Sequence, residues 1–169
     1  MNLPPGAVKN GFNLRDAGMD DVQDYIRVLS LCLKKYIDEN RDFFGEWNEE
    51  TVANDFKDKM KRTSFQKLLL YDETVGFMAY DIKNDKIDGI SINIIEKAQN
   101  NGIGSAYLSH IISLSKSQAK PIFLIVFKAN PAWKLYERFG FKVYETQGEL
   151  YMMTYTQTAI APSKEYCHD

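Results

Sequence analysis

Apolar residues in the first part of the chain recur with the period of a helix. Between residues 21 and 37 they lie three and four positions apart, at Val22, Tyr25, Ile26, Leu29, Leu33 and Tyr36. This spacing places them on one face of a helix. The acidic segment before them favours a helix start, because carboxylates stabilise the positive end of a helix dipole. We therefore expect a short strand at 12–15, a helix over 21–37, a polar loop and a second helix over 49–61.

The central part of the chain changes to the period of two that is typical of strands. Residues 64–85 predict two strands around a turn at Asp72–Thr74. Residues 90–95 predict a third strand, in which apolar and polar side chains alternate: Ile90, Ile92 and Ile94 against Ser91 and Asn93.

The last part of the chain combines both periods. It predicts a helix over 103–116, an apolar strand over 122–127, a short helix that ends near Gly140, and two strands around Gln147–Gly148. Strand 90–95, helix 103–116 and strand 122–127 form a βαβ unit, whose strands are parallel and whose crossover is right-handed. The remaining strands are joined as hairpins. The expected fold is mixed α/β, with a mostly antiparallel sheet flanked by helices.

Composition narrows the class of protein. The 169 residues suffice for one domain, with an irregular arm at 1–10, a core over about 12–156 and an irregular tail at 160–169. The formal net charge is -2, and no basic run interleaves with aromatics, so nucleic acid is a poor partner. Cys32 and Cys167 do not have the spacing of a metal-binding motif, so we expect no bound metal. This use of cysteine suits a protein of the reducing cytoplasm. No signal peptide or membrane-spanning run is apparent.

Two glycines, Gly102 and Gly104, stand where the helix at 103–116 begins, after the strand at 90–95. Free N–H groups and the helix dipole at such a point make an anion site. A Walker loop is excluded because Ser105-Ala106 follows the last glycine, where Lys-Ser/Thr is required. A dinucleotide fingerprint is excluded because Tyr107 occupies the position of its third glycine. A plain structural turn stays open at this point.

A second motif follows the strand at 122–127. Asn130, Tyr136 and Gly140-Phe141 stand in the segment "KANPAWKLYERFGF", and Gln99, Gly102 and Gly104 form a Q-x-x-G-x-G loop before it. Together these motifs resemble the GCN5-related N-acetyltransferase (GNAT) superfamily over about residues 12–156, although Ala132-Trp133 fills one motif position loosely. The resemblance implies that the two parallel strands splay apart and that acetyl-coenzyme A (acetyl-CoA) binds between them.

The resemblance also implies which residues bind the cofactor. The loop would hold the diphosphate of acetyl-CoA through Gln99, Asn100, Asn101, Gly102, Ile103, Gly104 and Ser105. Main-chain groups of Ile94 and Ile95 would pair with the pantetheine arm like an added strand. Asn130 would hydrogen-bond the arm from the other side.

The implied reaction is direct attack of a primary amine on the thioester in a ternary complex. Tyr136 would act as the general acid for the leaving thiolate, and a main-chain N–H near Ile94 would stabilise the carbonyl oxygen. Asp88 matches a carboxylate that some relatives use as a base, with a solvated turn residue and a water chain as alternatives. The acid role of Tyr136 has its own alternative, a packing residue of an amphipathic helix.

The acceptor is expected between the first two helices, at Tyr36, Phe44 and Trp47 beside several acidic residues. The alternative is that these aromatics belong to the core and that the acidic residues form a solvated helix edge. Such a wall attracts a cationic amine of a small molecule or peptide. A homodimer that pairs through the C-terminal hairpin is a further expectation. Two other functions stay open: a non-catalytic module that binds coenzyme A (CoA) or acetyl-CoA, and a binder of nucleotide phosphates.

Overall fold

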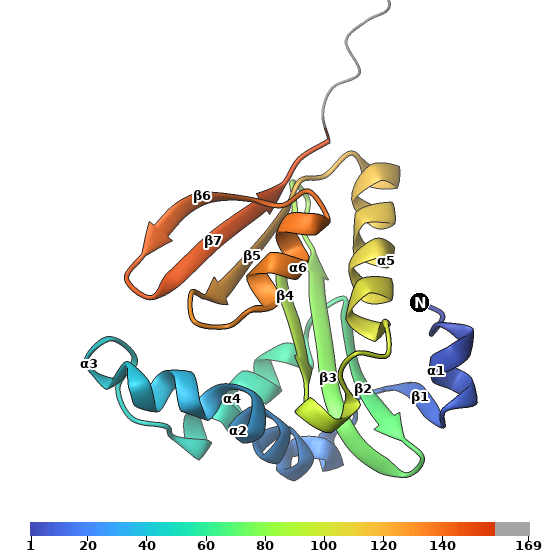
Figure 1. The fold of residues 1–169 in the computed structure, drawn as a ribbon, viewed down its shortest axis with the longest axis vertical. Coiled ribbons are helices and arrows are strands. Elements are labelled where there is room, and N and C mark those ends of the chain that lie inside the picture. The colour runs from blue at the N-terminus through green and yellow to red at the C-terminus, as the bar shows by residue number, and fades with distance from the viewer. Residues whose placement is uncertain (158–169) are drawn as a thin grey trace, which may run out of the picture.

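The computed structural model describes residues 1–157. Within these residues, seven strands form one sheet (Figure 1). Their bounds are β1 (Phe12–Asp16), β2 (Ser64–Leu70), β3 (Glu73–Ile82), β4 (Ile87–Ile94), β5 (Ile122–Phe127), β6 (Lys142–Gln147) and β7 (Leu150–Tyr155). The predicted strand at 122–127 is confirmed, whereas the strand predicted at 90–95 begins three residues earlier and ends at Ile94.

The strands follow the order β1-β2-β3-β4-β5-β7-β6, and every neighbouring pair is antiparallel except β4 and β5. The predicted mixed, mostly antiparallel sheet with one parallel unit is therefore confirmed. The ladder of β4 and β5 consists of a single pair, Ile87 with Ile122, among the described residues. Beyond this pair the two strands diverge, as Figure 1 shows.

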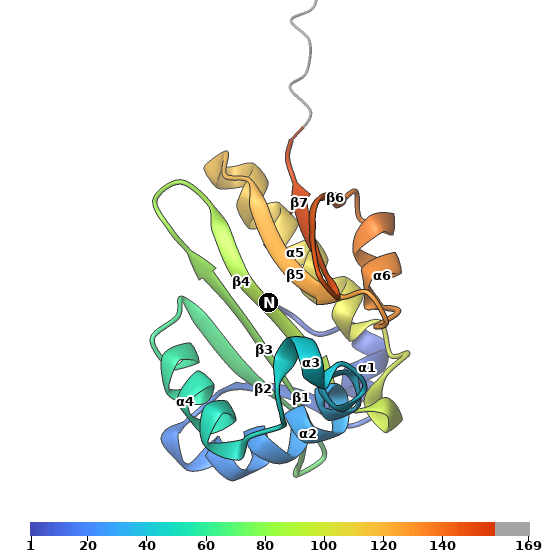
Figure 2. The ribbon, with the colours of Figure 1, turned by 90° about the vertical axis from the view of Figure 1, so that its left-hand side faces the viewer.

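Helices cover both faces of the sheet (Figure 2). They are α1 (Pro5–Lys9), α2 (Val22–Glu39), α3 (Arg41–Phe44), α4 (Glu49–Lys59), α5 (Ile103–Gln118) and α6 (Ala132–Arg138), with short 3-10 turns at Met19–Asp21 and Glu96–Ala98. Tyr25 of α2 packs its ring against Phe77 of β3, 5.1 Å between centroids. On the opposite face, Tyr80 of β3 meets Tyr107 of α5.

A β-bulge interrupts β4 before it reaches the diverging end. Ala79 pairs with Ser91 and Asp81 with Asp88, so Gly89 and Ile90 together face one residue of β3. Gly89 has φ +61, and a Cβ there would lie 1.8 Å from Nη1 of Arg62. Glycine fits this position because it tolerates positive φ and leaves room for the guanidinium.

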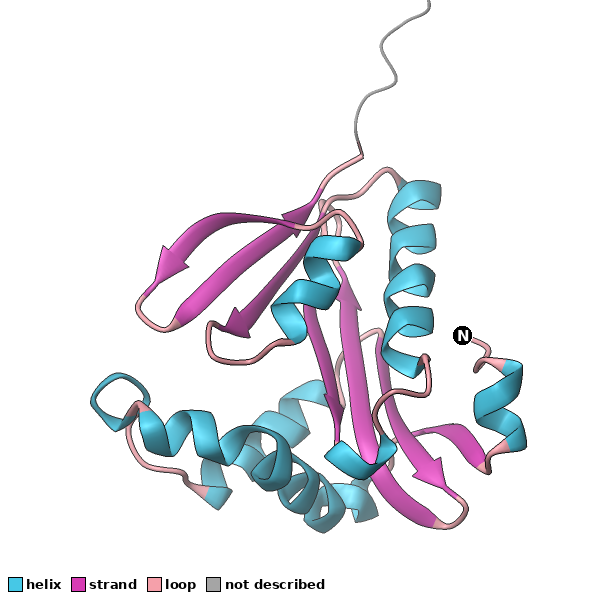
Figure 3. Cartoon of the chain, viewed as in Figure 1, coloured by secondary structure: helices cyan, strands magenta, loops and turns pink. Residues whose placement is uncertain are grey.

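Three expectations from the sequence were wrong in detail. The segment 1–10 contains helix α1, whose Pro5 suits a first turn because that position needs no N–H. The turn between β2 and β3 lies at Tyr71–Asp72, since β3 already begins at Glu73. The predicted polar loop after the first long helix contains α3 (Figure 3). The predicted tail at 160–169 lies outside the described residues.

The buried side chains of residues 1–157 form one continuous core on both faces of the sheet. Its large members include Tyr25, Phe77, Tyr107 and Ile111. In this part of the chain, no helix has the length and apolar character required to cross a membrane.

Candidate active site

The glycine loop ends at Gly102, which has φ +71 and immediately precedes the first residue of α5. Side-chain amides hold the loop in shape. Gln99 Nε2 donates to the Ile94 carbonyl over 2.8 Å, and Asn101 Nδ2 donates to the Gln99 carbonyl over 2.9 Å. The N–H groups of the first turn of α5 have no carbonyl partner within the helix, so they are available to an anion.

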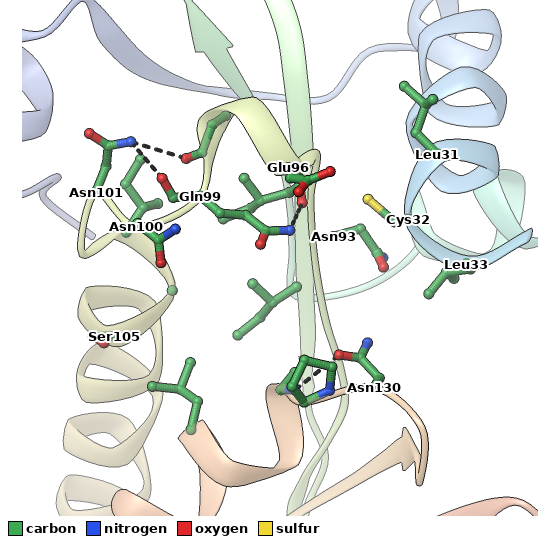
Figure 4. A pocket seen from close by; sticks show the side chains of 18 of the residues that line it. Leu31, Cys32, Leu33, Asn93, Glu96, Gln99, Asn100, Asn101, Ser105 and Asn130 are labelled. Atoms are coloured by element: carbon green, nitrogen blue, oxygen red, sulfur yellow. Dashed lines mark hydrogen bonds between the residues drawn. The ribbon is translucent and has the colours of Figure 1, made fainter. Parts of the chain in front are cut away.

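A cavity of about 580 Å³ opens in front of this loop, between α2, the end of β4 and the start of α6 (Figure 4). Its wall on α2 consists of Leu31, Cys32, Leu33, Lys35 and Tyr36. The opposite walls consist of Ile92–Ile94, Glu96, Ala98–Ser105, Asn130–Ala132, Leu135 and Arg138. The cavity therefore lies between the end of β4 and the segment that follows β5, at Asn130–Ala132, and among the described residues none of β5 itself lines it.

Most of the predicted cofactor-binding residues line this cavity. All seven residues from Gln99 to Ser105 do so, together with Ile94 and Asn130. Ile95 is not among the lining residues, and its N–H donates to the carbonyl of Val75, 3.0 Å away. The structure thus groups the loop with Asn130 and leaves Ile95 beside β3.

Asn130 lies two residues before the first residue of α6. Its Oδ1 accepts a hydrogen bond from the N–H of Ala132 over 2.9 Å, which satisfies one of the free donors at the helix start. This bond fixes the side chain at the rim of the cavity (Figure 4), and its Nδ2 donates to no partner among the described residues.

Tyr136 lies on α6, one residue after the cavity-lining Leu135. Its side chain is buried and packs at 6.0 Å between ring centroids against Phe141. Tyr136 itself is not a lining residue. Burial raises the pKa of its hydroxyl to about 12, because the phenolate is poorly solvated there.

Asp88 stands apart from the cavity. It precedes Asn93 by five residues, about 17 Å along a strand. Its Oδ2 is 2.8 Å from Nζ of Lys83 and 3.4 Å from Nζ of Lys86, and its Oδ1 is buried without a partner. The two lysines thus pair with this carboxylate at the end of β4 away from the cavity, and Asp88 is not among the lining residues.

Two of the three predicted acceptor residues come together. Tyr36 stacks on Phe127 at 5.4 Å, and Phe44 meets the same ring edge-on at 5.0 Å. Trp47 instead packs on the hydrophobic core. Beside this aromatic group, a groove of about 360 Å³ is lined by Asp38, Glu39, Asn40, Arg41, Asp42, Phe43 and Glu149.

The lining residues that were not predicted from the sequence include five with polar or ionisable side chains: Cys32, Lys35, Asn93, Glu96 and Arg138. Cys32 is half-buried, packs against the core and lines the cavity; burial raises the pKa of its thiol to about 11. Cys167 lies outside the described residues. Asn93 carried a signal that could have been used, since it is the polar residue nearest the glycine loop in an otherwise apolar strand end.

Lys35 and Arg138 are the cations that line the cavity. Within residues 1–157, neither forms an ion pair with a carboxylate. Their charges add to the positive potential of the helix N-terminus. The same range contains no group of three His, Cys, Asp or Glu side chains arranged to hold a metal ion.

Known structures with the same fold are numerous. PaiA N-acetyltransferase from Thermoplasma acidophilum, in complex with coenzyme A, matches 86% of this chain and 98% of its own, with a TM-score of 0.65 and 19% identity. The ribosomal-protein-S18-alanine N-acetyltransferase from Escherichia coli matches 94% and 99%, with a TM-score of 0.61 and 19% identity. Naa50 from Arabidopsis thaliana, in complex with the bisubstrate analogue CoA-Ac-MVNAL, matches 86% and 99%, with a TM-score of 0.60 and 17% identity.

None of the curated proteins is significantly similar to this chain in sequence. The family model described as "Acetyltransferase (GNAT) family" matches residues 34–141, more than half of the chain and including both motifs. The resemblance drawn from the glycine loop and the Asn130–Phe141 segment is thus confirmed, and the chain belongs to the acetyltransferase (GNAT) family.

Proposed function

We propose that this protein transfers the acetyl group of acetyl-CoA to a primary amine of a small molecule or peptide, by direct attack in a ternary complex. The observation that carries the proposal is the cavity at the divergence of β4 and β5, which combines a helix N-terminus with a glycine loop. The family membership and the coenzyme A complex of the Thermoplasma acidophilum relative support the same cofactor.

The cofactor would bind with its diphosphate on residues 99–105. Free N–H groups at the start of α5 are suited to phosphate oxygens, and Lys35 and Arg138 supply positive charge nearby. The pantetheine arm would then lie between β4 and β5, where the unpaired strand edges offer main-chain donors and acceptors. Ile95 contributes less than predicted, because its N–H is already bonded to Val75.

Tyr136 would hydrogen-bond the departing sulfur. With a pKa of about 12, its hydroxyl stays protonated throughout the neutral range and is always available as a donor. Full transfer of its proton to a thiolate, whose pKa is about 8.5, is uphill, so stabilisation of the sulfur by a hydrogen bond is its main contribution. Such a donor acts where charge develops in the transition state.

Cys32 lines the cavity but is a poor candidate for a covalent acyl carrier. The thiolate is the nucleophilic form of cysteine, and a pKa of about 11 leaves little thiolate at neutral pH. Direct attack by the amine is therefore favoured over an acyl-enzyme.

The amine must lose a proton, and Asp88 is the carboxylate that the resemblance assigns to this task. Its ion pairs with Lys83 and Lys86 and its distance from the cavity weigh against direct contact with the amine. Transfer of the proton to water is the simpler route for this site.

The acceptor would enter past Tyr36, Phe44 and Phe127, with the acidic groove at its outer end. Aromatic faces and carboxylates both attract a cationic amine. The bisubstrate complex of Naa50 supports a peptide amine as one member of this class.

Two-substrate initial-rate kinetics test the mechanism. Acetyl-CoA would be varied at several fixed concentrations of butylamine, spermidine and a tetrapeptide with a free N-terminus. Direct attack in a ternary complex predicts double-reciprocal lines that intersect, and Cys32→Ser should retain the pattern. Parallel lines, together with loss of transfer in Cys32→Ser, would instead establish an acyl-enzyme.

The second candidate function is a CoA-binding module without catalysis. It is favoured by one observation: among the described residues no buried carboxylate lines the cavity, and the one acidic lining residue, Glu96, is exposed. Acetyl-CoA binding by calorimetry without transfer to any of the amines would support the module.

A further inference from the structure

Asn93 is a buried polar side chain that the roles described above leave unused. It lies in β4 with 9% of its surface exposed, and it lines the cavity. Its Nδ2 donates to Oγ of Ser91 over 2.8 Å. No described group donates to its Oδ1, so this side chain presents an unused acceptor inside the cavity.

The face of β4 that carries Asn93 is the face directed at α2. Asn93 pairs across the sheet with Phe77, whose ring packs on Tyr25 of α2. The preceding residue, Ile92, points the other way, since its Cγ2 lies 4.0 Å from the Cβ position of Gly104 at the start of α5. Figure 4 shows Asn93 on the same side of the strand as Cys32 and Leu33 of α2.

This placement puts cofactor binding and acceptor binding on opposite faces of β4, at adjacent residues. The α5 side of the diverging strands holds the glycine loop, where the phosphates would bind. The α2 side holds the aromatic group of Tyr36 and Phe127, past which the acceptor would enter. Asn93 lies on the acceptor side, one residue before the Ile94 main chain that is expected to face the thioester.

Resting on the proposed acetyl transfer, we infer that Asn93 positions the attacking amine. Its Oδ1 accepts a hydrogen bond from the nitrogen and directs the lone pair toward the acetyl carbon. The nitrogen–carbon bond forms, the carbon–sulfur bond breaks, one amine proton passes to water, and sulfur leaves with the bonding electrons. Ser91 is a positioning residue, because its hydroxyl oxygen accepts from Nδ2 and thereby orients the amide with Oδ1 toward the amine.

An amide suits this task because it accepts a hydrogen bond without competing for the proton. A neutral acceptor leaves the amine nucleophilic and adds no charge beside the phosphates. Orientation of this kind lowers the barrier because the reacting groups no longer have to find their geometry during the reaction.

The test measures kcat/KM for butylamine, spermidine and the tetrapeptide in Asn93→Ala, Ser91→Ala and the double variant, with the acetyl-CoA Kd measured separately by calorimetry. We expect Asn93→Ala to lower kcat/KM about 10- to 100-fold, as for loss of one buried hydrogen bond, with the Kd unchanged within about twofold. Ser91→Ala should cost about threefold, and the double variant should be no worse than Asn93→Ala, because Ser91 acts through Asn93. Asn84→Ala, at an exposed turn, is the matched control.

Asn93→Leu, which has a similar shape and no polar atoms, gives the same test if the alanine variant does not fold. The inference is overturned if kcat/KM stays within twofold of the wild type, if the two single effects multiply, or if the acetyl-CoA Kd rises by the same factor. A wild-type protein that acetylates none of the amines would overturn the proposed function as well, and the two failures are thereby distinguished.

Discussion

In the proposed mechanism, Tyr136 combines a packing role with a chemical one. Its ring packs on Phe141, and this burial is what raises the pKa of the hydroxyl to about 12. A surface tyrosine would offer the same hydroxyl donor, but water would compete for its hydrogen bond. At the residue scale, burial therefore keeps the hydroxyl protonated over a wider pH range and makes it a weaker acid.

Replacement of this hydroxyl tests its role. We expect Tyr136→Phe to lower kcat by about 100-fold or more, since the thiolate loses its donor, with the acetyl-CoA Kd within twofold of the wild type. Because the pKa of Tyr136 is raised, the hydroxyl is protonated at every pH below about 12, and the wild-type rate profile should show no step from this group between pH 6 and pH 10. Steady-state kinetics across this range check both points.

Tyr155→Phe is the matched control, since the ring of Tyr155 packs on the same Phe141 at 5.6 Å and does not line the cavity. Equal losses of kcat in the two variants would mean that Tyr136 acts through packing alone.

At the scale of elements, the junction of β4 and α5 creates the site. The loop needs Gly102 for its positive φ, whereas Gly104 already lies inside the helix. A Cβ at Gly104 would meet Leu135 and Ile92 at ordinary contact distances of 3.6 and 4.0 Å. Glycine at position 102 is therefore required by the backbone conformation, whereas no contact within the described residues requires glycine at position 104.

Because of this difference, substitution by alanine should change the free energy of unfolding in opposite directions at the two positions. Gly102→Ala should lower the free energy of unfolding by about 1–2 kcal/mol, because a Cβ is strained in the left-handed region. If the loop relaxes to relieve that strain, CoA binding weakens by about tenfold. Gly104→Ala should keep the CoA affinity and raise the free energy of unfolding by up to about 1 kcal/mol, because alanine favours the helix.

Chemical denaturation and calorimetry on the two variants measure these quantities. The interpretation of Gly102 fails if Gly102→Ala matches the wild type in both, or if Gly104→Ala is the more damaging change.

The sequence predicted this junction because its signals are local. The alternation at 90–95, the two glycines and the apolar run at 122–127 were sufficient for the parallel unit, whereas the role of the loop residues needed the family resemblance, which also depends on the segment from Asn130 to Phe141. The surroundings of Asp88 were not predictable, because its lysine partners depend on how the β3–β4 hairpin closes. Asn93 was missed for a related reason, since alternation alone does not say whether a polar strand face is covered by a helix.

At the scale of the whole molecule, the sheet is held together weakly between β4 and β5, and the cavity lies at the end where these strands diverge, between β4 and the segment after β5. One residue pair joins the strands of β1–β4 to those of β5–β7 in the sheet. A ligand bound in the gap would contact both parts and stabilise the folded state. The predicted pairing of C-terminal hairpins between copies stays a prediction; β6, an edge strand whose residues are all exposed, is the strand that it would use.

Stabilisation by cofactor is measurable as a thermal shift. At 100 times its Kd, acetyl-CoA adds about 2.7 kcal/mol of stability, which raises the Tm of a chain of this size by about 5–10 °C. ATP at the same concentration should raise the Tm much less, because it lacks the pantetheine arm that fills the gap. A larger shift with ATP than with acetyl-CoA would favour a binder of nucleotide phosphates.

The central claim is that the cavity serves acetyl transfer and not binding alone. The most direct measurement uses acetyl-CoA labelled in its acetyl group, incubated with the protein and each of the three amines, with labelled amide and free CoA thiol quantified together. We expect labelled amide for at least one amine, in equal amount to the released thiol and dependent on Tyr136. Saturable acetyl-CoA binding with no labelled amide from any amine would contradict it.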